Sequence, residues 1–178
     1  MDLQALQYPI GKWTPKEQHT WEEIQESIAQ LKTIPAQYKE LTAGLSEEDL
    51  LKQYRKGSWT VRQVIHHVAD IHVLYFVRFK HALTEINSEG VVSKIDAWAN
   101  LEEAKNAPIE YSLTLLEGTH LRWTYLLEQM TEEDFQKGYY HPTRKMYLTL
   151  MDAVDVGVWH SKHHLAHIKI ALGKAIDL

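Results

Sequence analysis

The stretch Leu45–Leu50 (LSEEDL) returns as Met130–Phe135 (MTEEDF), and each copy is followed by a second sequence typical of a helix start. These starts are Thr60–Gln63 (TVRQ) and Thr149–Asp152 (TLMD), at nearly equal distances from the two copies. A hydroxyl side chain three positions before an acid or amide can cap the first turn of a helix. The two halves of the chain therefore share one plan. It predicts two helical hairpins about a pseudo-twofold axis, which make an all-α four-helix bundle with one long connection between the halves.

Apolar residues near a 3.6-residue period predict the long helices of this bundle. They are expected to run from about Thr14 to Ala43, from Thr60 to about Thr84, from about Pro108 to Met130, and onward from Thr149. Pro35 is expected to kink the first of them. The long connection, 87–107, is expected to hold a short helix near 95–105. The segment 139–147, with a turn at Pro142, could form a small β-hairpin.

The composition is that of a globular protein, with 178 residues, 44% hydrophobic and 24% charged. A chain of this length can bury one compact core, so we expect a single domain over residues 1–178. No apolar run reaches the roughly 20 residues that cross a bilayer, and the first residues lack the basic and apolar regions of a signal peptide. We therefore expect no membrane span and a cytoplasmic protein.

Charge and cysteine content narrow the chemistry further. The formal net charge is −5, and no cluster of lysine and arginine lies along one face, which argues against a nucleic-acid partner. The chain has no cysteine, which excludes disulfides, thiolate metal ligands and a cysteine nucleophile. A metal site in this protein would have to use imidazole, carboxylate and water.

Histidine is unusually frequent, with eleven in the chain and four of them in Trp159–Ile168 (WHSKHHLAHI). On a helical wheel His160 and His164 flank the apolar stripe, and their i, i+4 spacing brings two imidazoles within one turn. On the second long helix His67 faces the apolar stripe, whereas His66 is expected to face water. If these two helices pack side by side, three neutral imidazoles could bind one metal ion and leave positions open for catalysis.

The histidines also have simpler interpretations. A single histidine beside an apolar face is more often a hydrogen-bonded core residue than a ligand. His163 and His167 form a second i, i+4 pair, but their face of the helix is expected to be less buried. Four further histidines are assigned no place among the ligands, although the last could lie at the rim of a site: His72, His81, His120 and His141.

Other polar residues near the predicted trio have weaker assignments. Arg78 lies on the same helix face as His67, and a buried guanidinium needs an anionic partner. That partner is either an acid of the protein, in a salt bridge, or a carboxylate of a substrate. Asp70 and His163 are candidates for orienting the ligand imidazoles. No general base can be assigned from the sequence.

Several ordered blocks of the sequence resemble the DinB-like superfamily, and most closely its YfiT branch. The blocks are Tyr8–Gly11, Trp59–Asp70, Arg78–Lys80, Arg122–Trp123, Tyr140–Pro142 and Trp159–Ile168, so the resemblance covers nearly the whole chain. It implies an up-down-down-up four-helix bundle, with short extra helices, that binds one divalent metal ion per subunit, nickel or zinc. Carried over to matching positions, the metal ligands are His67, His160 and His164. The resemblance also implies a homodimer.

The chemistry implied by the resemblance has two forms. The YfiT branch is described as metal-dependent hydrolases of small molecules, in which the metal activates water. The superfamily also contains S-transferases that use bacillithiol, mycothiol or glutathione, and a chain without cysteine fits a low-molecular-weight thiol supplied from outside. A third hypothesis, of another class, is a non-catalytic metal-binding stress module. An open coordination position beside a pocket would favour the enzymes.

Overall fold

Four long helices form the body of the molecule in the computed structural model, which describes residues 3–176. They are α2 (Trp21–Thr42), α4 (Val61–Thr84), α7 (Ile109–Glu128) and α9 (Leu150–Ala171). The shorter elements are α1 (Leu3–Gln7), α3 (Glu47–Leu50), α5 (Ile95–Ala99), α6 (Glu102–Asn106), α8 (Glu132–Gln136), β1 (Gly138–His141) and β2 (Met146–Thr149). The expected bundle with short helices and a hairpin is confirmed.

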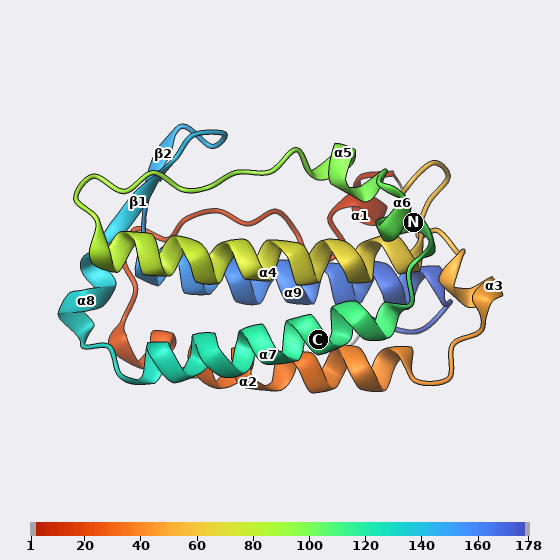
Figure 1. Ribbon diagram of the computed structural model, residues 1–178, viewed down its shortest axis with the longest axis horizontal. Coiled ribbons are helices and arrows are strands. Elements are labelled where there is room, and N and C mark those ends of the chain that lie inside the picture. Colours follow the sequence, from red (N-terminus) through yellow and green to blue (C-terminus); the bar gives the residue numbers. More distant parts are fainter. Residues whose placement is uncertain (1–2, 177–178) are drawn as a thin grey trace.

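The long helices are arranged up-down-down-up (Figure 1). Helices α2 and α9 run in one direction, and α4 and α7 run in the other. Each of α4 and α2 packs against both α7 and α9, so α2 and α4 lie across the diagonal of the bundle. The expectation of two hairpins of adjacent helices is therefore wrong. The segment containing α5 and α6 crosses over α4, which lets α7 start at the same end of the bundle as α4.

The repeated helix starts are capped as the sequence predicts. Thr60 and Thr149 accept hydrogen bonds from the backbone of Gln63 and Asp152, and both of these side chains bond back to the capping residue's N–H. Ser46 and Thr131 cap the short helices α3 and α8 in the same way. Helix α2 begins later than expected, because its capping box is formed by Thr20 with Glu23. The connection also holds two short helices where one was expected.

The hairpin packs against the end of the bundle and closes one side of the site described below. Its strands are antiparallel, with Gly138 opposite Thr149 and Tyr139 opposite Leu148. Tyr139 and Leu148 are fully buried. A Cβ atom at Gly138 would lie 2.1 Å from the carbonyl oxygen of Leu148, so only glycine allows this pairing.

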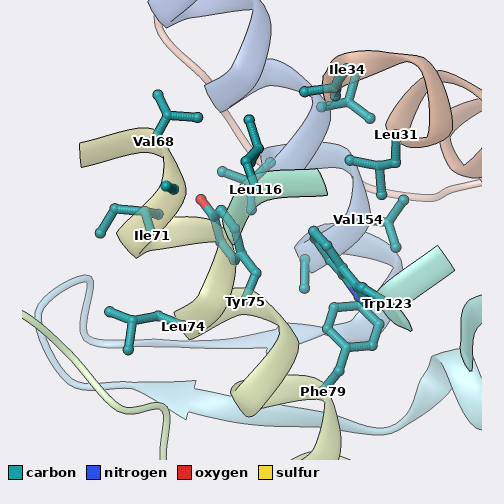
Figure 2. Packing of buried hydrophobic residues seen from close by; sticks show 14 of the residues in the cluster. Leu31, Ile34, Val68, Ile71, Leu74, Tyr75, Phe79, Leu116, Trp123 and Val154 are labelled. Atoms are coloured by element: carbon teal, nitrogen blue, oxygen red, sulfur yellow. The ribbon is translucent and has the colours of Figure 1, made fainter. Parts of the chain in front are cut away.

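Aromatic packing ties the long helices together. Trp123 of α7 is fully buried, with its ring 5.3 Å from Phe79 and 5.9 Å from Tyr75 of α4, as Figure 2 shows. Gly157 gives this ring room on the α9 side, because a Cβ there would lie 3.0 Å from Trp123. This packing fixes α4 and α9 side by side, which positions their histidines. No helix within residues 3–176 is long and apolar enough to cross a membrane.

Candidate metal centre

Three buried imidazoles from two neighbouring helices converge, as the wheels predict. His67 comes from α4, and His160 and His164 come from α9. The ring centroids are 5.2 Å apart for His67 and His160, 4.8 Å for His67 and His164, and 4.6 Å for the α9 pair. One ring nitrogen from each residue lies within 4.8 Å of the other two. The trio could therefore hold one ion.

The spacing of the nitrogens fits a shared transition metal. The Nε2 atoms of His67 and His160 are 3.2 Å apart. Two imidazole nitrogens at about 2.0–2.1 Å from one zinc ion are roughly 2.8–3.4 Å apart in octahedral to tetrahedral geometry. Nitrogen-only donors suit zinc and nickel better than calcium or magnesium, which prefer oxygen.

A chain of buried histidines extends from His160 to the opposite side of the bundle. The Nδ1 atom of His160 lies 3.3 Å from Nε2 of His72. The Nδ1 atom of His72 lies 2.9 Å from Nε2 of His120, and Nδ1 of His120 lies 2.7 Å from the carbonyl oxygen of Leu31. The chain therefore links α9 to α4, α7 and α2 in turn.

The far end of this chain determines where every proton lies. A carbonyl oxygen only accepts, so Nδ1 of His120 must donate to Leu31. Burial lowers the pKa of His120 to about 4 and that of His72 well below its usual value, so both rings are neutral at pH 7. Nε2 of His120 then accepts from Nδ1 of His72, which leaves Nε2 of His72 as an acceptor. This atom faces the Ser161 hydroxyl at 3.1 Å and Nδ1 of His160 at 3.3 Å. Because the hydroxyl donates to the carbonyl oxygen of Gly157, the donor to His72 is Nδ1 of His160. The Nε2 atom of His160 is left with a lone pair that faces the convergence point.

A shorter chain supports His164. The Nδ1 atoms of His164 and His167 are 3.3 Å apart, and Nε2 of His167 is 3.3 Å from the carbonyl oxygen of Gln7. By the same reasoning, His167 donates to Gln7 and accepts from His164. The Nε2 atom of His164 is then left without a proton. Hydrogen bonds of this kind hold metal-binding histidines in the required tautomer.

The local electrostatics keep the trio in the metal-binding form. Burial lowers the pKa of His67 to about 3, with a smaller contribution from the charge of His163. Burial also places the pKa values of His160 and His164 well below the usual value, and neighbouring histidines lower them further. Neutral imidazole is the form that donates an electron pair to a metal.

The trio lies in a pocket of about 710 Å³, a volume suited to a small molecule. Trp59 and Trp159 line it, and the Trp59 ring is 4.6 Å from the His67 ring. His141, from the hairpin, also lines the pocket, which agrees with the expected place at its rim. Another hollow, of about 590 Å³ between α2 and α9, has no histidine in its lining.

The structure places the other predicted residues at different distances from the trio. His163 lines the pocket, stacks on Trp159 at 4.6 Å, and shares a second possible ligand group with His164 and His167. Arg78 also lines the pocket. Asp70 is half-buried, and burial together with Glu103 raises its pKa to about 6. Within the described part of the chain, no hydrogen bond joins Asp70 to a histidine of the trio.

Two burial predictions from the wheels are wrong. His66 is 2% exposed, because the α6–α7 segment covers it and both of its nitrogens bond there, to Ser112 Oγ and the carbonyl of Ala107. His163 is 7% exposed, since Tyr8 of the N-terminal segment lies 6.1 Å from its ring. A wheel shows only the apolar stripe of its own helix, so it misses faces covered by connecting segments.

The fold agrees with the comparisons to known proteins. A family model described as the DinB superfamily matches residues 30–168. The chain therefore belongs to the DinB superfamily, as its sequence blocks indicate.

Similar proteins indicate the branch of the family to which the chain is most similar. The chain is 46% identical over 166 residues to a protein of Bacillus pumilus named "Putative metal-dependent hydrolase". The match covers 93% of this chain and 94% of the relative. It is 42% identical over 163 residues to the "Putative metal-dependent hydrolase YfiT" of Bacillus subtilis, covering 92% of each. These relatives confirm the resemblance to the YfiT branch.

Solved structures support the same grouping. That of YfiT from Bacillus subtilis, described as "a probable metal-dependent hydrolase with an unusual four-helix bundle topology", matches with a TM-score of 0.91 and 39% identity, covering 96% of this chain and 99% of that one. A mycothiol-dependent maleylpyruvate isomerase matches with a TM-score of 0.67 and 12% identity, over 85% of this chain and 63% of that one. This second likeness shows a shared fold.

Proposed function

We propose that this protein is a metal-dependent hydrolase of a small molecule, with one divalent ion, nickel or zinc, bound by His67, His160 and His164. The observation that carries the proposal is the convergence of three buried, neutral imidazoles on one wall of a pocket. A divalent ion bound there supplies Lewis-acid activation of water or of a substrate carbonyl. The names of the similar Bacillus proteins support the same reaction class.

In this proposal, the residues around the trio orient its imidazoles and exclude water. Three protein ligands leave coordination positions open, as catalytic sites require. His72 and His167 orient two of the ligand imidazoles through their hydrogen bonds. Trp59 covers His67 and keeps bulk water from that side of the site.

A thiol-dependent S-transferase is the second candidate. The observation in its favour is the absence of cysteine, since the nucleophilic thiol would have to come from a small molecule. The fold is shared with a mycothiol-dependent isomerase, which supports the same idea at the level of architecture only. A non-catalytic metal-binding module is the third.

An activity screen separates these candidates. The purified protein, loaded with nickel or zinc, is incubated with a panel of esters and amides, and separately with a chlorodinitrobenzene with and without small thiols. The proposed function predicts metal-dependent hydrolysis that His164→Ala abolishes. Product that forms only with a thiol would replace the hydrolase by the S-transferase. Stoichiometric metal without turnover in either assay would favour the non-catalytic module.

The proposal includes a single-domain, cytoplasmic homodimer. Large apolar side chains on one face of α7 support a second copy as the partner, because exposed patches of this kind mark interfaces. They are Tyr111, Leu115, Leu121 and Tyr125, which are 45–69% exposed. Sedimentation of the wild type is expected to give a dimer, and Leu121→Glu a monomer with unchanged helix content. A wild-type monomer at micromolar concentration would refute the dimer.

A further inference from the structure

The pocket that holds the histidine trio carries an excess of positive charge. Its charged lining residues, apart from histidines, are Arg55, Arg78 and Arg144 against the single acid Asp96. Asp96 and Arg55 both act on the hydroxyl of Tyr54, so these opposite charges lie at the same end of the pocket. Neither Arg78 nor Arg144 forms an ion pair within residues 3–176. The acid that acts with both of them on the Tyr139 hydroxyl, Asp152, is itself bonded to His19 and to the Thr149 helix cap. The charged side chains of the pocket wall are therefore mainly positive, although the formal net charge of the whole chain is −5.

Arg78 is buried without a counter-charge. It is 5% exposed, and its Nε and Nη2 atoms both donate to the carbonyl oxygen of Val91, at 2.8 and 2.5 Å. Its guanidinium carbon lies 5.6 Å from the ring centre of Tyr75 and 5.9 Å from that of Tyr139. Within residues 3–176, no carboxylate forms an ion pair with it. The salt bridge considered from the sequence is therefore not formed in this part of the chain.

A buried cation of this kind is costly unless an anion approaches it. Removing a guanidinium from water is repaid only by charged or well-aligned hydrogen-bonding partners. A carbonyl oxygen and two ring faces offset part of this cost. The side of Arg78 that faces the pocket is the remaining place for a negative charge.

Arg144 adds a second cation at the same end. It lies in the hairpin turn, is exposed, and has its guanidinium carbon 5.2 Å from the ring centre of Trp13. The pKa of His141 falls to about 4, first through burial and then through the charges of Arg78 and Arg144. Both arginines therefore act on the same part of the pocket wall.

Arg78 lies within reach of a molecule bound at the histidine trio, and Arg144 lines the same pocket and acts on His160 through its charge. His67, Ile71, Tyr75 and Arg78 all line the pocket from successive turns of α4. The ring centre of Tyr75 is 5.6 Å from the guanidinium carbon of Arg78 and 5.9 Å from the ring centre of His160. These two distances together place the guanidinium within about 12 Å of the His160 ring. Figure 2 shows the Tyr75 hydroxyl directed away from Trp123.

We infer that Arg78 and Arg144 form an anion subsite, which selects substrates that carry a carboxylate or phosphate up to about 12 Å from the group at the trio. Arg78 is the fixed part, held by Val91 and the tyrosine rings, and can present two parallel N–H donors to an oxyanion. Arg144 is the outer part, since its side chain is exposed to solvent. The selection of substrates for hydrolysis rests on the proposed function, whereas the binding of an anion by the two arginines does not depend on it.

Anion binding is measured by isothermal titration at low ionic strength, with inorganic phosphate and with succinate as probes. The wild type is expected to bind at least one of them, more weakly as salt is added, because salt screens charges. Arg78→Met and Arg144→Met are each expected to weaken binding by roughly tenfold or more, the usual loss for a charge-assisted hydrogen bond. Arg78→Lys should retain part of the affinity, since it keeps the charge but not the planar donors.

Two controls separate this inference from the proposed function. Arg122→Met removes an exposed arginine that packs on Phe76, and is expected to leave anion binding unchanged. Binding is repeated on His164→Ala without metal, where it must persist if arginines rather than an ion hold the anion. Absence of binding by the wild type, or an equal loss in Arg122→Met, overturns the subsite. Hydrolysis of the ester panel is measured in a separate experiment. The anion subsite and the proposed hydrolase activity can therefore be refuted independently of each other.

Discussion

Replacing His67 with alanine is expected to lower divalent-metal affinity by more than about 100-fold, because loss of a ligand exceeds the 10–100-fold cost of losing a supporting hydrogen bond. The purified variant should lose its metal on dialysis against a weak chelator and should show no metal-dependent activity. The helical fold should persist, since many apolar side chains of α4 besides His67 pack in the core. Elemental analysis and circular dichroism provide the two measurements.

The choice of His67 is deliberate, because His164 belongs to both possible ligand groups. Loss of metal from His164→Ala would therefore not show which group binds the ion, the trio with His67 and His160 or the group with His163 and His167. The variants His67→Ala and His167→Ala distinguish the two groups, because each of these residues belongs to one group only. A second control is His81→Ala, which removes a partly exposed histidine from the far end of α4. Metal retained by His67→Ala and lost from His167→Ala would show that the ion binds the second group.

The bundle and the convergence of three histidines were predictable because both depend on local signals. Capping boxes at Thr60 and Thr149 fix where two long helices start, and the apolar stripes fix which faces meet. His67, His160 and His164 lie on those faces, so their convergence needs only that α4 and α9 are neighbours. The diagonal placement of α2 and α4 was not predictable, because the repeat gives the order of elements but not their packing.

The chain of histidines behind the trio could not be found in this way. His72 and His120 lie on different helices, and their pairing depends on the parallel packing of α4 against α7. Each was assigned no role because a single buried histidine has no partner that a wheel can show. The only available signal was their number: buried imidazoles need hydrogen bonds, and several on facing helices can satisfy one another.

Replacing His72 with phenylalanine is expected to lower metal affinity by 10–100-fold while all three ligands remain. The variant removes the acceptor that keeps the Nδ1 proton of His160 in place, so the His160 ring can rotate or adopt the other tautomer. His72→Gln should restore part of the affinity, because its side-chain oxygen can accept at nearly the position of Nε2. Affinity is measured by competition with a chromophoric chelator. The visible spectrum of the cobalt(II) protein reports any change at the ligands.

His72→Phe also leaves Nε2 of His120 without a partner, which is expected to cost about 1–3 kcal/mol of folding free energy. The matched control is therefore His66→Phe, which breaks the bonds of another buried histidine of α4, to Ser112 and Ala107, away from the trio. Both variants should unfold at lower urea concentration than the wild type, but only His72→Phe should lose metal affinity. If the two lose it equally, general destabilisation rather than the orientation of His160 explains the effect, and the histidine chain has no part in holding the metal.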